Sequence, residues 1–191
     1  MIITTQNYQP PKLTLPVGER DHSEGPSNAR MVLVEYGDYQ CPYCGAAYPI
    51  VKKVQKELGT RLRFVFRNFP ITTSHPQAEW AAETAEAAAV QGRFWEMHDF
   101  LYENQASLSD HGFFANHERK LKLDVKRLEQ EVAQHIHLGR VREDFMSGVK
   151  SGVNGTPTFF IGGARYDGYP GFDPLIAALE AAEKGRPQPG R

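Results

Sequence analysis

The sequence predicts an α/β fold in which helices surround a central β-sheet and an all-helical subdomain interrupts the α/β unit. Three observations predict this class. Residues 31–72 carry a strand pattern, a helix pattern and a second strand pattern in succession. Residues 73–152 have apolar residues at helical spacing and no strand pattern, and residues 153–185 return to a strand, a glycine turn and a last helix.

We divide the chain accordingly. Residues 1–30, which hold several prolines among polar residues, are interpreted as an extended N-terminal arm that either packs on the domain or hangs free. Residues 31–72 and 153–185 together form the α/β domain, and residues 73–152 form the helical insertion. Residues 186–191 are a C-terminal tail.

Whole-chain properties limit the partners. The chain has 191 residues, 40% of them hydrophobic, which is enough to bury one core. The 22 basic and 23 acidic residues nearly cancel, and no long Lys/Arg block predicts nucleic-acid binding. No apolar run approaches the roughly 18 residues of a membrane span. We therefore expect a monomer that binds no nucleic acid and does not cross a membrane.

The first residues bear on localisation. Residues 1–7 have neither the basic nor the apolar region of a signal peptide, which predicts a cytoplasmic protein. A chain whose export signal had been removed would look the same and would be periplasmic. The lack of a signal-peptide pattern in these residues thus favours a reducing compartment.

The first strand and helix of the α/β unit are predicted next to each other. Residues 31–36 include apolar residues at positions that point to either face of a strand, which indicates a central strand covered on both faces. Pro42 suits the first position of a helix, because its missing N–H would be unpaired there. The helix ends at Gly59, and Pro49 inside it is expected to kink it. Its apolar stripe comprises Cys44, Ala47, Tyr48, Val51, Val54 and Leu58.

The remaining sheet elements follow the same reasoning. Residues 62–69 predict a second strand, parallel to the first through the intervening helix. Residues 156–161 predict a further strand, which turns at two glycines and pairs with residues 164–169. Residues 173–184 predict a closing helix.

Cys41 and Cys44 are the only cysteines of the chain. Two cysteines three positions apart form a redox pair, half of a metal site, or a coincidence. Cys41 comes just before the first helical turn, where free N–H groups and the helix dipole favour a thiolate. Cys44 is one turn further in and is expected to be shielded. An accessible, acidic thiol beside a buried one suits dithiol–disulfide exchange.

Glu35 lies in the predicted central strand among apolar neighbours. A buried carboxyl group has a raised pKa and could move a proton to or from Cys44 during exchange. The alternative is an ordinary strand glutamate that points at water.

Two motifs together carry a family resemblance. Cys41-Pro42-Tyr43-Cys44 stands at a strand–helix junction, and the distant run 155–159, Gly-Thr-Pro-Thr-Phe, leads into an apolar strand. In this order they resemble a DsbA-type member of the thioredoxin superfamily, over about residues 30 to 184. The resemblance implies a thioredoxin-like fold with a helical insertion and a protein thiol:disulfide oxidoreductase.

The resemblance also implies roles for single residues. Cys41 matches the nucleophilic cysteine and Cys44 the resolving one, while Glu35 matches the buried acid beneath them. The substrate is expected to contact the residues around the disulfide: Pro42, Tyr43, Thr156 and Pro157, the last matching the cis-proline that faces the disulfide. Pro49 matches the proline that kinks the helix. Tyr43 stands where DsbA carries a histidine, which argues against a strongly oxidising potential.

The activity implied by the resemblance needs neither a metal nor an organic cofactor. Its partners are protein or small-molecule thiols and disulfides, and a redox partner that resets the dithiol. The direction, oxidase or reductase, stays open.

Two alternatives belong to other classes. One is a non-catalytic interaction module in which the cysteine pair is a redox switch. The other is a metal-binding pair at a dimer interface, with two cysteines from each chain. A metal site within one chain lacks ligands, because structural zinc takes four and His135 and His137 are spaced to face differently on a helix. The other histidines are interpreted as surface or packing residues: His22, His75, His98, His111 and His117.

Overall fold

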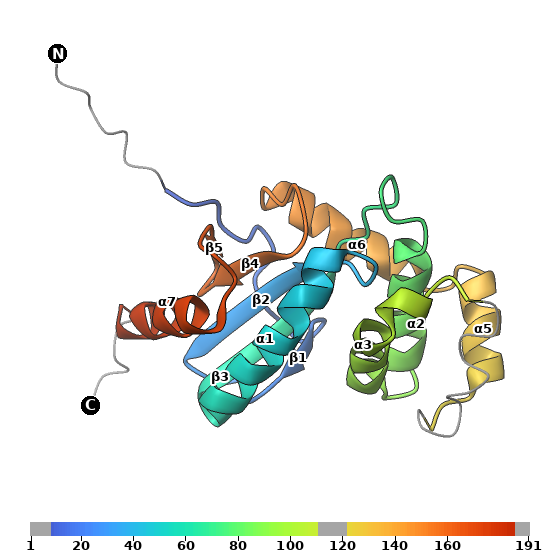
Figure 1. Ribbon diagram of the computed structural model, residues 1–191, viewed down its shortest axis with the longest axis horizontal. Helices are drawn as coiled ribbons and strands as arrows, with labels where there is room; N and C mark the ends of the chain where they lie inside the picture. Colours follow the sequence, from blue (N-terminus) through green and yellow to red (C-terminus); the bar gives the residue numbers. More distant parts are fainter. Residues whose placement is uncertain (1–8, 111–121, 186–191) are drawn as a thin grey trace, which may run out of the picture.

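A computed structural model of the protein describes residues 9–110 and 122–185 (Figure 1). The predicted tail at 186–191, the first eight residues of the predicted arm, and His111 and His117 lie outside the described residues. None of the described helices is long and apolar enough to cross a membrane.

The sheet has five strands in the order β1-β3-β2-β4-β5. The central pair β2 and β3 is parallel, and the other neighbours are antiparallel. This confirms the predicted α/β class, the parallel strand pair and the terminal hairpin. The strands are β1 (His22–Glu24), β2 (Met31–Gly37), β3 (Leu62–Asn68), β4 (Thr158–Ile161) and β5 (Ala164–Tyr166).

Helices cover the sheet and extend beyond it. Figure 1 shows α1 and α7 together against the sheet, and α2, α3 and α5 gathered at the opposite end of the molecule from α7. Between residues 73 and 152, the described part of the chain contains helices and no strand, as the sequence predicts. The helices are α1 (Pro42–Leu58), α2 (Ala78–Ala89), α3 (Phe94–Glu103), α5 (Val125–Ala133), α6 (Leu138–Lys150) and α7 (Phe172–Lys184), with short 3-10 helices η1 (Gly59–Arg61) and η2 (Gln105–Ser107).

Strand β2 has an apolar core on each face. Leu33 belongs to the larger core, together with α1, α3 and α7. Val34 and Tyr36 belong to the second core, where Phe145 of α6 packs. Successive side chains of a strand point to opposite faces, so the apolar run of β2 reflects burial on both sides. Glu35 is therefore placed inside the protein.

The predicted N-terminal arm packs on both edges of the sheet. Lys12 forms an isolated antiparallel bridge with Ala164, and the Leu13 N–H donates to the Gly163 carbonyl at 2.9 Å. The arm is not extended chain throughout, because His22–Glu24 forms the edge strand β1 against β3. A three-residue strand of polar residues carries no apolar alternation, which is why the sequence did not predict it.

Arg67 ties this N-terminal segment to the sheet. Its side chain is fully buried, and its guanidinium donates to both carboxylate oxygens of Asp21 at 2.8 and 3.0 Å. It also donates to the Leu15 carbonyl and the Tyr36 hydroxyl, both at 2.9 Å. Burial alone would raise the pKa of Asp21, but hydrogen bonds and the charge of Arg67 hold it below its ordinary value.

Arg67→Met is expected to destabilise the protein by about 3–5 kcal/mol, because it leaves the buried Asp21 carboxylate without its partner. Chemical denaturation at pH 7 measures the change. The matched control is Arg63→Met on the same strand, since within residues 9–110 and 122–185 Arg63 donates to the Gly18 carbonyl and the Ser23 hydroxyl, at 3.3 and 3.2 Å, and to no carboxylate. Its expected cost is about 1 kcal/mol. Equal effects of the two variants would contradict the role of the buried ion pair.

Candidate active site

Both cysteines lie at the start of α1, where the sequence places them. Cys41 is the N-cap residue and Pro42 follows at the first helical position. The Gly45 N–H donates to the Cys41 carbonyl at 3.0 Å, which closes the first turn. Pro49 lies inside α1, and the helix continues past it to Leu58. Both thiols are free.

The Cys41 side chain is more covered than the sequence predicts. It retains 3% of its accessible surface and Cys44 retains none, so the expectation of an open Cys41 thiol is wrong for this structure. The cover is the loop before β4, where Cys41 Sγ lies 3.3 Å from the Thr156 carbonyl oxygen and, when protonated, donates a hydrogen bond to it. The Thr156–Pro157 peptide bond is cis. Tyr43, between the cysteines, is 74% exposed.

The environment of Cys41 favours its thiolate. A hydrogen bond from Cys44 is the largest effect that lowers the pKa of Cys41, which falls from 9.0 to about 5 although burial opposes the shift. The side chain of Thr156 and the backbone N–H groups of Tyr43 and Cys44 add to it. The Thr156 hydroxyl is buried and has no hydrogen-bond partner among the described residues, which leaves it available to the thiolate. Free N–H groups at the helix start thus act as expected.

Cys44 has the opposite environment. Burial raises the pKa of Cys44 well above its ordinary value, and its hydrogen bond to Cys41 and the charge of Glu35 raise it further. The Asp38 N–H donates to its sulfur at 3.5 Å. At neutral pH the pair therefore consists of a thiolate at Cys41 and a thiol at Cys44.

Glu35 is buried in β2, with 2% of its surface exposed, rather than pointing at water. Its Oε1 has no hydrogen-bond partner among the described residues. Burial, and then the charge of Cys41, raise the pKa of Glu35 from 4.5 to about 8. The carboxyl group is thus protonated at neutral pH and close to its titration point.

The reaction of Cys41 with iodoacetamide should reach half of its maximal rate near pH 5, because the thiolate is the reactive form. A free cysteine reaches that point near pH 8.5. Cys44→Ala should move the midpoint upward, because it removes the largest effect that lowers the pKa of Cys41. Mass spectrometry follows the extent of alkylation. A midpoint near pH 8.5 in the unaltered protein would refute the thiolate assignment.

Sequence reasoning missed the side chains that hold the cysteine loop. The Asp38 carboxylate accepts from the Gln40 N–H, the Ile71 N–H and His75 Nδ1, each at 2.8 Å. An aspartate shortly before a helix is a residue type that accepts from backbone N–H groups, and that signal could have identified Asp38. His75 was interpreted as a surface or packing residue, and its bond to Asp38 gives it a place in this loop.

Gln105 holds the same loop from the helical insertion. Its Nε2 donates to the Tyr39 and Cys41 carbonyls at 2.8 and 2.9 Å. A Cβ at Gly45 would lie 2.3 Å from Gln105 Oε1, so the absence of a side chain there leaves room for this contact. Nothing in the spacing of the sequence indicates that a residue so distant reaches the cysteines.

The structure does not gather the histidines considered as zinc ligands around the cysteines. His135 Nδ1 hydrogen-bonds Glu83 Oε1, and His137 Nε2 hydrogen-bonds Glu131 Oε2. Among the described residues, no cluster of three or more His, Cys, Asp or Glu side chains includes either cysteine.

Comparison with known proteins places the chain in a family. Residues 18–181 match the family described as Thioredoxin. Among solved structures, oxidised BdbD from Bacillus subtilis is similar with a TM-score of 0.78 and 21% identity, covering 93% of this chain and 97% of that one. A thioredoxin-like oxidoreductase from Silicibacter pomeroyi has a TM-score of 0.73 and 25% identity, covering 88% and 95%. Wolbachia pipientis alpha-DsbA1 has a TM-score of 0.75 and 17% identity, covering 90% and 94%.

Sequence relatives carry a different name. The Na(+)/H(+) antiporter NhaA 3 of Salinispora tropica is 43% identical over 183 residues, which are 94% of this chain and 28% of that protein. The Na(+)/H(+) antiporter NhaA of Herminiimonas arsenicoxydans is 37% identical over 167 residues, 87% of this chain and 26% of that protein. The chain thus spans about a quarter of the length of these relatives.

Proposed function

Because this chain belongs to the thioredoxin family and has a DsbA-like fold, we propose that it is a thiol–disulfide oxidoreductase acting through Cys41 and Cys44. One observation carries the proposal. Two free thiols one helical turn apart have pKa values shifted in opposite directions, down to about 5 at Cys41 and upward at Cys44. A stable thiolate beside a protonated partner is the asymmetry that ordered disulfide exchange uses.

Reduction of a substrate proceeds in two displacements. The Cys41 thiolate attacks one sulfur of the substrate disulfide, forms a mixed disulfide and expels the other substrate sulfur as a thiolate. Cys44 then loses its proton and attacks Cys41 Sγ, which releases the second substrate thiolate and leaves the Cys41–Cys44 disulfide. Two electrons pass from the cysteine pair to the substrate, and oxidation of a substrate dithiol runs through the same steps in reverse.

Glu35 is proposed as the group that takes the proton from Cys44 in the second displacement and returns it in reverse. Burial and then the charge of the Cys41 thiolate raise the pKa of Glu35. That charge is gone in the mixed disulfide, so the carboxyl group ionises more readily at the step in which it accepts the proton of Cys44. Its charge influences the pKa of Cys44, which supports direct electrostatic communication between the two groups.

The substrate is proposed to bind over the cis peptide and the start of α1. An extended segment that displaces the Cys41–Thr156 hydrogen bond would expose Cys41 Sγ and pair with the backbone at Thr156 and Pro157, in the manner of an added strand. Pro42 and the exposed ring of Tyr43 would contact the same segment.

The pKa of Cys41 supports an intermediate redox potential. A value of about 5 lies between those of thioredoxin, about 7, and DsbA, about 3.5. A more stable thiolate stabilises the reduced form and makes the disulfide more oxidising. We propose a cytoplasmic location, where the glutathione poise would drive the pair toward substrate reduction with a cellular reductant resetting it.

Antiport is not part of this proposal, because the antiporter name belongs to proteins of which the chain spans about a quarter. Insulin reduction in the presence of dithiothreitol tests the proposal. Catalysis above the uncatalysed rate is expected from the unaltered protein. A protein that binds insulin chains without accelerating their reduction would be the non-catalytic interaction module. Stoichiometric zinc shared by the cysteines of two chains would favour the metal-binding pair.

A further inference from the structure

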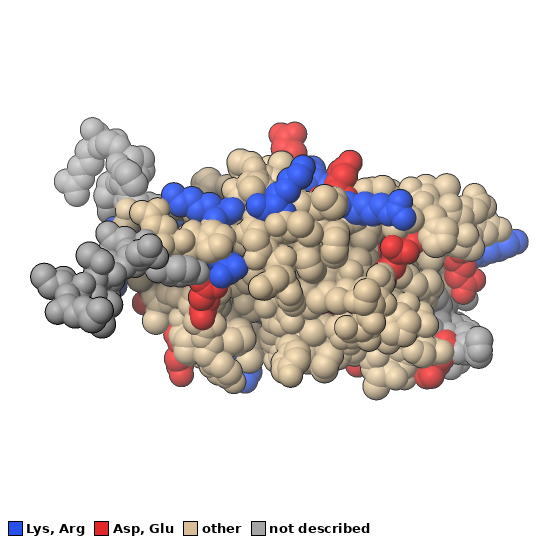
Figure 2. Space-filling view, turned by 90° about the horizontal axis from the view of Figure 1, so that it is seen from above, with Lys and Arg blue, Asp and Glu red and all other residues tan. Residues whose placement is uncertain are grey.

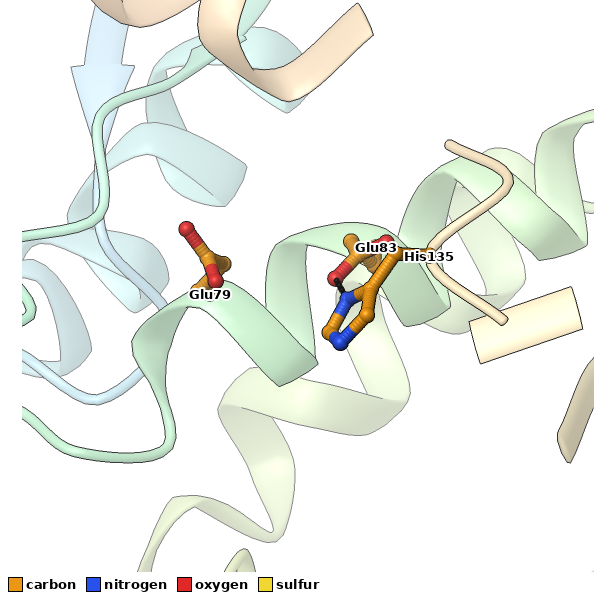
Figure 3. Close-up of side chains that lie close together, drawn as sticks. All are labelled: Glu79, Glu83 and His135. Carbon is orange, nitrogen blue, oxygen red and sulfur yellow. Dashed lines mark hydrogen bonds and ion pairs between the residues drawn. The ribbon is translucent and has the colours of Figure 1, made fainter. Parts of the chain in front are cut away.

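A second cluster of polar side chains lies in the helical insertion, apart from the cysteines. Glu79 and Glu83 stand one turn apart on α2, and His135 lies in the turn between α5 and α6. One ligand atom from each lies within 4.8 Å of the other two. Figure 3 shows the imidazole ring of His135 pointing at the carboxylate of Glu83.

The charge of the surrounding pocket favours a cation. The three side chains line a pocket of about 620 Å³ between α2 and α5. Asp110 and Glu129 line it as well, and none of its described lining residues is Lys or Arg. The face in Figure 2, by contrast, carries both Lys or Arg and Asp or Glu side chains. Among the described residues, the pocket wall therefore concentrates acidic groups and contains neither Lys nor Arg.

Glu83 supplies an independent sign of a missing partner. Its side chain is 1% exposed, and Oε1 hydrogen-bonds His135 Nδ1 at 2.8 Å. Its other oxygen, Oε2, is buried and has no hydrogen-bond partner among the described residues. A buried carboxylate oxygen without a donor is costly, so such an atom normally faces a ligand, an ion or a water molecule.

We propose that Glu79, Glu83 and His135 bind one divalent transition-metal ion of the zinc type. Imidazole selects transition metals over Mg²⁺ and Ca²⁺, and zinc accepts imidazole nitrogen and carboxylate oxygen together. The ion replaces the hydrogen bond between His135 Nδ1 and Glu83 Oε1 and lies beside the Glu83 carboxylate, so that Oε2 gains the partner it lacks. A water molecule completes four ligands.

The geometry requires only a small adjustment. Tetrahedral zinc with bonds of about 2.1 Å places its ligand atoms about 3.4 Å apart. Rotation of the partly exposed Glu79 side chain shortens its separations, which are now within 4.8 Å. His135, whose side chain is 62% exposed, moves back slightly from its present 2.8 Å to Glu83 Oε1. Glu83 is held by its burial and provides the fixed ligand.

The bound ion joins two parts of the helical insertion. It connects α2 to the α5–α6 turn, whose position at His135 has a φ of 54°. The start of α2 is also bonded to the cysteine loop, since the Gln77 N–H donates to Gln40 Oε1 at 2.7 Å. A metal that binds only the folded protein raises its stability by mass action.

The test is a titration with zinc sulfate of a Cys41→Ser/Cys44→Ser protein, which removes the thiols as competing ligands. Calorimetry should show one ion bound per chain, and the unfolding temperature should rise with zinc concentration. In that background, Glu83→Gln and His135→Asn should each weaken binding by at least about tenfold. Glutamine preserves the shape of Glu83, and asparagine tolerates the positive φ at His135.

His137→Gln is the matched control. His137 lies two residues from His135 and hydrogen-bonds Glu131 at 2.7 Å, outside the cluster, so its replacement should leave zinc affinity unchanged. Circular dichroism without zinc verifies that each variant is folded. Zinc binding that is absent at 1 mM, on the order of the weakest specific sites, overturns the proposal. Unchanged affinity in Glu83→Gln and His135→Asn, or tighter binding of Ca²⁺ than of Zn²⁺, also overturns it.

Discussion

Cys41→Ser is expected to reduce insulin-reduction activity to less than about 1% of the unaltered protein, because a serine hydroxyl cannot replace the thiolate nucleophile. Cys41 is the thiol whose pKa falls to about 5, so it alone is ionised at neutral pH. The turbidity of precipitating insulin chains measures the rate.

Cys44→Ser is the matched variant and should behave differently. It keeps the Cys41 nucleophile but removes the resolving thiol, so the first displacement should proceed and the mixed disulfide should accumulate. Mass spectrometry under non-reducing conditions detects that adduct at Cys41. An adduct at Cys44 in the Cys41→Ser protein would show that the roles of the two cysteines are exchanged. Full activity of the Cys41→Ser protein would show that Cys41 is not the nucleophile.

Glu35→Gln is expected to slow the resolution of the mixed disulfide by about 10²-fold, the low end of what a positioned acid–base group contributes. Glutamine keeps the shape of the side chain but cannot accept the proton of Cys44. The pH profile of resolution in the unaltered protein should have an inflection below 8, because the charge of Cys41 no longer raises the pKa of Glu35 in the mixed disulfide, and the variant should lack that inflection. Stopped-flow measurement with a preformed mixed disulfide isolates this step.

The same substitution has a stability signature. The pKa of Glu35 is raised in the folded protein, so the folded state holds this proton more tightly than the unfolded state. The contribution of this proton to the free energy of unfolding is fully present below the unfolded-state pKa of 4.5, and it is lost as pH rises through the folded-state pKa of about 8. At pH 7 the loss amounts to about 3 kcal/mol, from two and a half pKa units at about 1.36 kcal/mol each.

Glu35→Gln should therefore gain stability relative to the unaltered protein between pH 5 and pH 8. Glu57→Gln, at an exposed position of α1, is the control and should show no such trend. A stability difference that stays constant over this pH range would show that Glu35 does not titrate as described.

Local patterns were sufficient for much of this fold. The apolar run at 31–36 predicted β2 and its coverage on both faces, because only a central strand buries both sets of side chains. The spacing after Pro42 predicted α1 and its end at Gly59. Local patterns also identified three candidate site residues, because the chemistry of each follows from its position at a helix start or in a buried strand: Cys41, Cys44 and Glu35.

Features that depend on distant partners were beyond such patterns. Arg67 is a charged residue within the predicted strand 62–69, yet it is buried because Asp21, 46 positions earlier, neutralises it. The cover over Cys41 comes from Thr156, 115 positions away. Gln105 reaches the cysteine loop from another subdomain. Each contact depends on tertiary packing, which neither propensity nor periodicity records.

The most direct test is the equilibrium of the Cys41/Cys44 pair with glutathione, quenched by alkylation and resolved by mass spectrometry. The proposed mechanism predicts a reversible two-electron transition with both cysteines changing together. We expect its midpoint to lie between the potentials of thioredoxin and DsbA, about −270 and −120 mV, because the intermediate pKa of Cys41 favours an intermediate stability of the reduced form. Two thiols that stay reduced at every glutathione ratio would contradict disulfide exchange by this protein.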